Sequence, residues 1–353
     1  MTEIKYIGMD VHMAMTVIAV ANNVGKVIAE AIVETKTRTI LDFLKGQRGT
    51  LHVTFEEGTQ AAWLYDLIRP HVACVVVCDA RKIPPQNNKA DKSDARHLAE
   101  LLRTNGLKAV YHGEHSTQSL KEYVRSYVAI MRDGSRVKNR VKSLFRARGI
   151  ACQGGGVYAE EERAQWLSKL SNGAACARVS RLWRELDCLA ELRDEAEEDM
   201  TAEARKHPAT KIFKSIPGIG FVRAAVILGI AGTPHRFRTR KQFWAYCGLA
   251  VRSEISAEYE LVDGRIGKSK KRILVRGLNR NYNRALKDVF KAAATTAARS
   301  IWKSQFDAMV ADGTEESLAR LTLARKIAAI TLALWKKGEL YDKKKLNFVH
   351  AAA

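Results

Sequence analysis

The first hundred residues alternate between short apolar runs and amphipathic segments. Three apolar runs with short connections open the chain and predict a meander of three β-strands: IKYIGMDV, MTVIAVAN and GKVIAEAIVET. Beyond them, TRTILDFLKGQ and QAAWLYDLIRPH have the spacing of helices, and LHVTFEEGT and VACVVVCDA that of strands. A further helix begins within KADKSDARHLAELL. The predicted order is βββαβαβα, which favours a mixed sheet covered by helices on both faces.

The middle of the chain has a helical pattern. Residues 117–150 predict a long basic helix, because residues 121–149 hold nine Lys or Arg against two acids. Between 158 and 206 an apolar stripe, which Arg193 interrupts, approximates the a and d positions of a coiled coil: Leu182, Leu186, Leu189, Ala196 and Met200. This stripe predicts either a helical hairpin or short coiled coil, which could dimerise, or a helix packed on its own domain.

A second globular region is expected from about Pro208. A turn with two glycines, SIPGIG, precedes an apolar helix, and residues 288–340 again have a helical pattern. Between them, residues 236–287 hold fourteen basic and four acidic residues with interleaved aromatics, a composition typical of phosphate contacts combined with base stacking. We expect four parts: an α/β catalytic domain at 1–115, helices at 116–206, a mostly helical domain at 207–300 and a helical tail at 301–353.

Charge narrows the class of partner. The 353 residues include 59 Lys and Arg against 38 Asp and Glu, a formal net charge of +21, which points to a polyanion. We find no apolar run of 18 residues, signal peptide or lipidation motif, so a cytoplasmic protein bound to nucleic acid, rather than to a membrane, is expected. The six cysteines form no CxxC pair and suggest neither a zinc ribbon nor a disulfide framework.

Four acids at the ends of predicted elements are the candidate catalytic residues. Asp10 lies in the first strand, Glu56 ends the fourth, and Asp91 and Asp94 open the third helix on one face. If the first and fourth strands are neighbours and this helix crosses them, the carboxylates converge and need cations, and two Mg²⁺ (or Mn²⁺) ions suit such oxygen ligands. Alternatively, the two helix acids simply stabilise a helix N-terminus, and Glu57 could take the place of Glu56.

These motifs resemble a known family. GMDVH, TFEEGT and KADKSDARHLAELL are similar to the D-E-D-D motifs of the pilin-gene-invertase-like insertion-sequence transposases, and SIPGIGFVRAAVILGIAG, RFRTRKQFWAYCGLAVR and GRIGKSKKRILVRGL to that family's second domain. The resemblance spans about residues 4–290. It implies a RuvC-like, ribonuclease-H-type fold for the N-terminal domain, with Asp10, Glu56, Asp91 and Asp94 as metal ligands.

The resemblance also implies a serine nucleophile in the second domain. Counting from Gly248-Leu249 leads to Ser256, but GLAVRSEISAEY lacks the family's proline after Gly-Leu and its glycine after the serine. Ser253 is therefore an alternative. A serine attacking a phosphodiester would form a covalent serine–DNA link and conserve the bond for rejoining.

Partners follow from the same resemblance. It implies a recombinase that acts on double-stranded donor and target DNA in the nucleoid of a bacterial or archaeal cell, guided by a structured noncoding (bridge) RNA, as a homo-oligomer of dimers or tetramers. The IPGIG turn resembles phosphate-gripping helix-hairpin-helix loops, though a plain glycine turn fits equally. The expected nucleic-acid-binding residues are Arg236, Arg238, Arg240, Lys241, Lys268, Lys270, Lys271, Arg272 and Arg276.

Two other functions fit parts of the sequence. A RuvC-like junction resolvase would use the same acids with a metal-activated water and need no serine. A non-enzymatic nucleic-acid-binding protein would need neither. His12 and His97, each close to a candidate acid in the chain, are expected to lie beside the ligands or at the surface rather than to bind metal.

Overall fold

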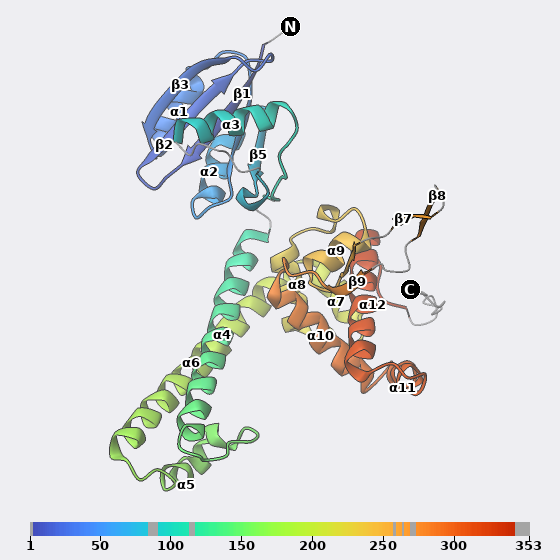
Figure 1. Ribbon diagram of the computed structural model, residues 1–353. Coiled ribbons are helices and arrows are strands. Elements are labelled where there is room, and N and C mark those ends of the chain that lie inside the picture. The colour runs from blue at the N-terminus through green and yellow to red at the C-terminus, as the bar shows by residue number, and fades with distance from the viewer. Residues whose placement is uncertain are drawn as a thin grey trace. The chain divides into compact units, whose positions relative to one another are not determined.

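The computed structural model of the protein describes residues 3–83, 91–112, 117–256, 259–262, 265–268 and 273–342. The chain divides into two compact units, Met1–Gly113 and Glu114–Ala353 (Figure 1). Each unit is described by itself below. Among the described residues, no helix combines the length and the apolar character needed to span a membrane.

The N-terminal unit has the predicted order of elements. The βββαβαβα expectation is confirmed by β1 (Ile4–Val11), β2 (Met15–Ala21), β3 (Val27–Glu34), α1 (Thr37–Lys45), β4 (Thr50–Glu56), α2 (Ala61–Ile68), β5 (Cys74–Cys78) and α3 (Asp91–Arg103). The strands form one mixed sheet in the order β3-β2-β1-β4-β5. The first and fourth strands are therefore neighbours, which meets the condition for the candidate acids to converge.

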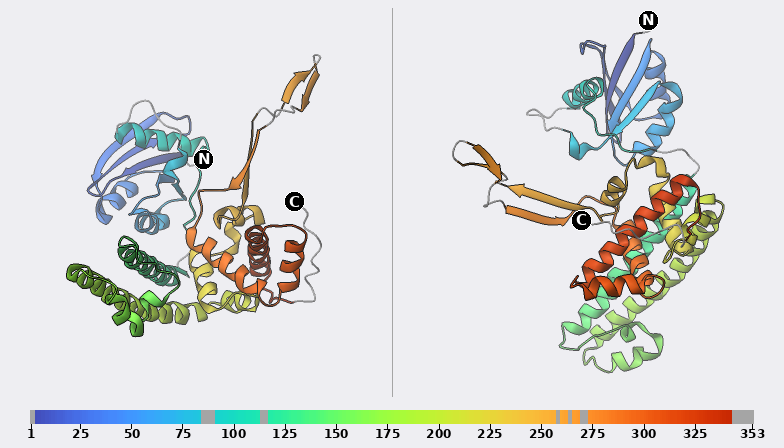
Figure 2. Two further views of the ribbon diagram at one scale, coloured as in Figure 1. Left: turned by 60° about the horizontal axis from the view of Figure 1, so that its bottom comes forward. Right: turned by 90° about the vertical axis from the view of Figure 1, so that its right-hand side faces the viewer.

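Helices cover both faces of this sheet. Because side chains alternate along a strand, Ile7 and Met9 of β1 face α1 and α2, where they join Ile40, Leu44 and Leu64 in one core. On the other face, Val17 and Ala19 of β2 pack against Ala95 of α3. The left view of Figure 2 shows the sheet between these two layers. The predicted two-sided covering is confirmed.

The C-terminal unit is mostly helical. Its helices are α4 (Gln118–Arg146), α5 (Arg163–Leu167), α6 (Gly173–Arg205), α7 (Pro208–Ser215), α8 (Phe221–Ala231), α9 (Arg240–Tyr246), α10 (Arg284–Ala298), α11 (Lys303–Ala311) and α12 (Glu316–Lys337). The long basic helix predicted at 117–150 is α4.

The apolar stripe of α6 packs within the chain. Helices α4 and α6 lie side by side (Figure 1), and Leu182 and Leu186 of α6 share a core with Val137 and Val141 of α4. Further along α6, Met200 is buried in the main helical core. The stripe therefore serves a contact between two helices of one chain, which fits both a helical hairpin and a helix packed on its own domain, and dimerisation stays a prediction.

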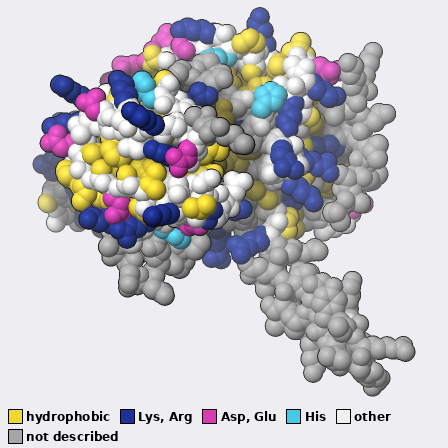
Figure 3. Space-filling view, turned by 90° about the horizontal axis from the view of Figure 1, so that it is seen from above, with side chains coloured by type: hydrophobic (Ala, Val, Ile, Leu, Met, Phe, Trp, Pro, Cys, Tyr) yellow, Lys and Arg dark blue, Asp and Glu magenta, His cyan; other side chains and the backbone are white. Residues whose placement is uncertain are grey.

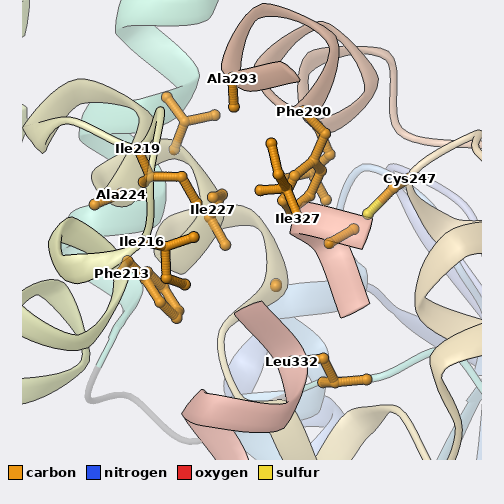
Figure 4. Close-up of a cluster of buried hydrophobic side chains, with 14 of the residues drawn as sticks. Phe213, Ile216, Ile219, Ala224, Ile227, Cys247, Phe290, Ala293, Ile327 and Leu332 are labelled. Carbon is orange, nitrogen blue, oxygen red and sulfur yellow. The ribbon is translucent and has the colours of Figure 1, made fainter. Parts of the chain in front are cut away.

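A single large core joins the remaining helices. It is built from apolar residues of α7, α8, α9, α10 and α12, among them Phe213, Ile227, Phe290 and Ile327 (Figure 4). Cys247, which follows α9, is fully buried in this core.

Four strands interrupt the helices where none was expected. β6 (Val251–Ser256) pairs antiparallel with β9 (Ile273–Leu278), and β7 (Tyr259–Val262) pairs with β8 (Arg265–Lys268) (Figure 2). The β-branched residues of VRSEIS and ILVRGL are a weak signal that could have predicted these strands. Residues 236–287, which hold the basic residues with interleaved aromatics, are therefore partly β-strand.

Candidate active site

Two neighbouring parallel strands bring the first two acids together. β1 pairs with β4 up to Met9 and Phe55, so Asp10 and Glu56 occupy the next position on each strand. The carboxyl ends of parallel strands meet at one edge of a sheet. Asp10 and Glu56 therefore lie at the same edge.

Helix α3 supplies the other two acids. Asp91 and Asp94 lie in its first turn, and the helix packs directly on β1 at Gly8. A Cβ atom at Gly8 would lie 2.1 Å from the backbone oxygen of Ala95 and 2.6 Å from the backbone nitrogen of Ala99. Only glycine allows this approach, which holds the start of α3 close to the end of β1.

The electrostatics of the acids show that they act on one another. Burial raises the pKa of the Asp10 carboxyl, His12 opposes the shift, and the negative charges of Asp91 and Asp94 add to it. Burial also raises the pKa of Glu56, and the charges of Asp10 and Asp94 act in the same direction. The cluster disfavours its own anionic form, so a cation among these carboxylates would be stabilising.

Three side chains are close enough to share one ion. Asp10, His12 and Asp91 each offer a ligand atom, and the three atoms lie within 4.8 Å of one another. The Nε2 atom of His12 lies 3.1 Å from Oδ2 of Asp10 and 3.8 Å from Oδ2 of Asp91. Oxygen and imidazole donors at this spacing fit a divalent cation. Glu56 and Asp94 are outside this group of three and influence it through their charges.

His12 was expected beside the ligands or at the surface, and only its position two residues after Asp10 indicates that its imidazole could share an ion with Asp10 and Asp91. That spacing places both residues on the same side of an extended chain, and this signal could have found it. His97 on α3 has a buried Nε2 atom without a hydrogen-bond partner among the described residues, and it is not one of the three grouped side chains.

The structure separates Glu56 from its neighbour Glu57. The carboxylate of Glu57 lies 2.6 Å from Nε2 of His112, whose ring stacks on Tyr65 with centroids 5.0 Å apart. The backbone N–H of Glu57 donates to Cys78. Glu57 is therefore bound to a different set of groups, and Glu56 is the one whose pKa responds to Asp10 and Asp94. Neither His112 nor its pairing was expected from the sequence.

Both candidate serines lie in the C-terminal unit. They belong to β6, where Ser253 stands opposite Arg276 and Ser256 opposite Ile273 in the ladder with β9. Their side chains are outside the described part of the structure.

The expected nucleic-acid-binding residues fall into three groups. Arg238, Arg240 and Lys241 are exposed around the start of α9. Arg236 is half-buried, and its guanidinium group lies 4.3 Å from the ring centre of Tyr246. Lys268 and Arg276 belong to β8 and β9 with undescribed side chains, and Lys270, Lys271 and Arg272 lie outside the described residues.

Base stacking by two aromatics of this window is a wrong expectation. Phe237 and Phe243 are buried in the helical core and pack edge to face, with ring centres 4.9 Å apart. Trp244 is half-buried, and its indole N–H donates to the backbone oxygen of Arg325. These rings hold α9 in place, because the apolar core gains more from them than an exposed surface would.

The IPGIG turn joins α7 to α8. Gly218 has a φ of +81°, and a Cβ there would lie 2.4 Å from the backbone oxygen of Ala293, so the turn packs closely on α10. Gly220 caps α8 without a side-chain hydrogen bond, and the ammonium group of Lys214 lies 3.3 Å from the ring centre of Phe221. A basic side chain therefore lies beside this helix start, which is compatible with phosphate binding by the backbone N–H groups there, while the packing on α10 alone would also explain the first glycine.

Known proteins match both units. The model of the DEDD transposases of the IS110 type, described as a transposase, matches residues 7–147 and includes all four acids. The model described as the "Transposase IS116/IS110/IS902 family" matches residues 210–310, which include both serines.

Two curated proteins are similar over long segments. The transposase for insertion sequence element IS1111A of Coxiella burnetii is 27% identical over 264 residues, covering 72% of this chain and 69% of that protein. The insertion element IS110 uncharacterized 43.6 kDa protein of Streptomyces coelicolor is 28% identical over 175 residues, covering 50% of this chain and 40% of that protein. These matches do not show that the chain belongs to a pilin-gene-invertase-like subtype that uses a serine nucleophile.

Proposed function

Because the chain belongs to the IS110/IS116 family of DEDD transposases, we propose that it cuts and exchanges DNA strands with divalent cations held by its clustered carboxylates. The observation that carries this proposal is that Asp10 and Glu56 follow paired positions of two neighbouring parallel strands, while Asp91 and Asp94 open the helix that packs on β1 at Gly8. The proposed ligands are Asp10, Glu56, Asp91 and Asp94.

The donor set fits Mg²⁺ or Mn²⁺. Carboxylate oxygens are the ligands that these hard cations prefer, and the raised pKa of Asp10 and Glu56 marks charge that a cation would balance. When bound, such cations stabilise the negative charge that develops on the attacking and leaving oxygens of a phosphodiester. The strand ends and α3 hold the carboxylates in place before DNA arrives, so little reorganisation accompanies the reaction.

An excision assay in cells tests this function. The element would be carried on a plasmid with its native flanking DNA, and the rejoined product detected by amplification across the junction. We expect product with the wild-type protein and none with Asp94→Asn at equal protein level. Unchanged excision by Asp94→Asn would contradict a catalytic role for the acid cluster.

We further propose a serine nucleophile, with Ser256 as the first candidate and Ser253 as the alternative. In this step the serine oxygen bonds to phosphorus, one phosphorus–oxygen bond of the strand breaks, and the released oxygen takes up the serine proton. The reverse attack by another DNA hydroxyl frees the serine, so the number of phosphodiester bonds is conserved. The only support is the resemblance of residues 248–259 to the family's motif.

Denaturing gels with labelled DNA separate the two serines from a water mechanism. A protein–DNA adduct that Ser256→Ala removes and Ser253→Ala retains identifies Ser256, and the opposite pattern identifies Ser253. Cleavage without an adduct, unaffected by either change, would support hydrolysis instead. Hydrolysis is the junction-resolvase alternative, in which a metal-activated water attacks and no serine is needed.

Guidance by a structured noncoding RNA and assembly into dimers or tetramers complete the proposal. The net charge of +21 supports a nucleic-acid partner, and strand exchange needs at least two active sites held together. Sequencing of RNA that co-purifies from cells carrying the native flanks tests the first, and mass photometry of the purified complex tests the second. Bulk cellular RNA that salt removes would contradict the guide, and a monomer on DNA would contradict the assembly.

A further inference from the structure

The imidazole of His12 lies close to two carboxylates of the cluster and is also exposed to solvent. Its imidazole Nε2 atom lies 3.1 Å from Asp10 and 3.8 Å from Asp91, and its side chain is 54% exposed. The imidazole is therefore within reach of both carboxylates and of solvent, from which an ion would arrive.

The backbone of His12 is fixed on both sides. Its N–H donates to the backbone oxygen of Met15 over 3.0 Å, and its carbonyl oxygen accepts from the hydroxyl of Thr35 over 2.8 Å. The Thr35 hydroxyl also lies 2.8 Å from that of Thr16, which is fully buried. These bonds fix the backbone from which the imidazole reaches the acids, and such a fixed attachment point favours a preorganised binding site.

The separations match those of ligands around one ion. In an octahedral site with metal–ligand distances of about 2.1 Å, neighbouring ligand atoms lie about 3.0 Å apart and opposite ones about 4.2 Å apart. The distances from His12 to Asp10 and Asp91 fall within this range. A carboxylate can also rotate about its terminal bond to complete the geometry.

We propose that His12 is a direct nitrogen ligand of the cation held by Asp10 and Asp91, and that it makes this site prefer Mn²⁺ over Mg²⁺. This inference rests on the proposed metal-dependent function. Mg²⁺ strongly prefers oxygen ligands, whereas imidazole binds transition metals well and Mn²⁺ accepts both donor types. A site of carboxylates alone would discriminate much less between the two ions.

The test measures metal binding by the full chain without DNA. Mn²⁺ would be titrated and its free signal followed by electron paramagnetic resonance, with Mg²⁺ as competitor to give the ratio of the two dissociation constants. Pulsed measurements on bound Mn²⁺ report the ¹⁴N coupling of a coordinated imidazole. Both readouts are independent of catalysis.

The variants are His12→Ala and His12→Gln, the second of which keeps a hydrogen-bonding group without an imidazole. Because losing even a group that only supports a ligand costs about 10–100-fold in metal affinity, we expect either variant to weaken Mn²⁺ binding at least about tenfold. Mg²⁺ binding should change by less than about threefold, because its oxygen ligands remain. The ¹⁴N coupling should disappear in both variants.

His71→Ala is the matched control. His71 is an exposed histidine of the same unit, in the connection before β5 and therefore at the opposite edge of the sheet. It should leave both affinities and the ¹⁴N coupling unchanged.

Two outcomes overturn the inference in distinguishable ways. If Asp10→Asn abolishes Mn²⁺ binding while both His12 variants keep the wild-type affinity, selectivity and ¹⁴N coupling, His12 is no ligand and the carboxylate site stands. If the wild-type protein binds neither ion, the metal-dependent function and the role of His12 fail together.

Discussion

At the scale of single residues, the site depends on which carboxylates lie close enough for their charges to raise the pKa of a neighbour. Asp10 and Glu56 are partly buried acids whose pKa values rise through burial and through neighbouring carboxylates. Glu57, one residue further, is instead paired with His112. Two adjacent glutamates therefore have different environments, and this difference gives a matched pair of variants.

We expect Glu56→Gln to lower DNA cleavage by at least about 100-fold, since loss of a group that merely supports a metal ligand costs about 10–100-fold. Glu57→Gln keeps a partner for His112 and should retain cleavage within about tenfold of the wild-type rate. Single-turnover cleavage in Mg²⁺ measures both. Loss of cleavage only in Glu57→Gln would reverse the assignment.

The reactivity of the Cys78 thiol measures how well the chain is buried beside Glu56. Cys78 stands opposite Glu56 in the ladder, and burial raises its pKa to about 11, with the Glu56 charge acting in the same direction. Burial likewise raises the pKa of Cys247. The thiolate is the reactive form, so both thiols should resist iodoacetamide at pH 8.

Cys188 is exposed on α6 and serves as the reactive reference. Mass spectrometry of native protein should show alkylation at Cys188 well before Cys78. Equal rates at the two thiols would mean that β5 does not bury Cys78 beside Glu56.

At the scale of elements, the contact between α3 and β1 positions the acids. A methyl group at Gly8 would overlap the α3 backbone at Ala95, so Gly8→Ala must push the helix away. We expect a loss of about 1–3 kcal/mol in the local free energy of opening at α3, as in other overpacked contacts, together with lower cleavage. Hydrogen exchange of the full chain measures the first.

Gly134→Ala is the control for this change. Gly134 lies within α4 with nothing within 4 Å of an added Cβ, so alanine should stabilise that helix by up to about 1 kcal/mol. Wild-type exchange at α3 in Gly8→Ala would contradict the close packing.

Much of the N-terminal unit could be predicted from sequence because its elements are locally encoded. Apolar runs such as CVVVC and the helical spacing of TRTILDFLK indicated each element's type. The order of elements allowed β1 and β4 to be neighbours but did not require it, and the structure places them side by side. The pairing of Glu57 with His112 could not be predicted, because 55 residues separate them. Nor could the partner of the α6 stripe, since the same periodicity serves a contact within the chain and one between chains.

At the scale of the whole molecule, charge decides the class of partner. Dark blue Lys and Arg side chains are spread widely over the face shown in Figure 3, and Asp and Glu are sparse there. Along α4, some cations are paired within the chain, as Arg140 is with Glu185. Exposed Lys and Arg side chains around α9 are better placed to bind phosphates. A cation that already pairs with an acid gains less free energy from binding a phosphate, because the pair must be given up.

Salt dependence distinguishes these two sets of cations. The triple variant Arg238→Ala, Arg240→Ala, Lys241→Ala should lower the slope of log affinity against log salt by about 2–3 units on double-stranded DNA, if each contacts one phosphate. The control replaces three arginines of α4 that pair with acids, Arg125, Arg136 and Arg140, and should lower it by less than about one unit. Equal slopes for the two triple variants would contradict a DNA contact around α9.

The central claim is that the ends of β1 and β4 and the start of α3 together hold a divalent cation. Crystals of the protein soaked in Mn²⁺ and measured at the manganese absorption edge test it directly. We expect an anomalous peak within coordination distance of Asp10 and of at least one α3 carboxylate. Peaks elsewhere on an ordered chain, with none among these acids, would contradict it.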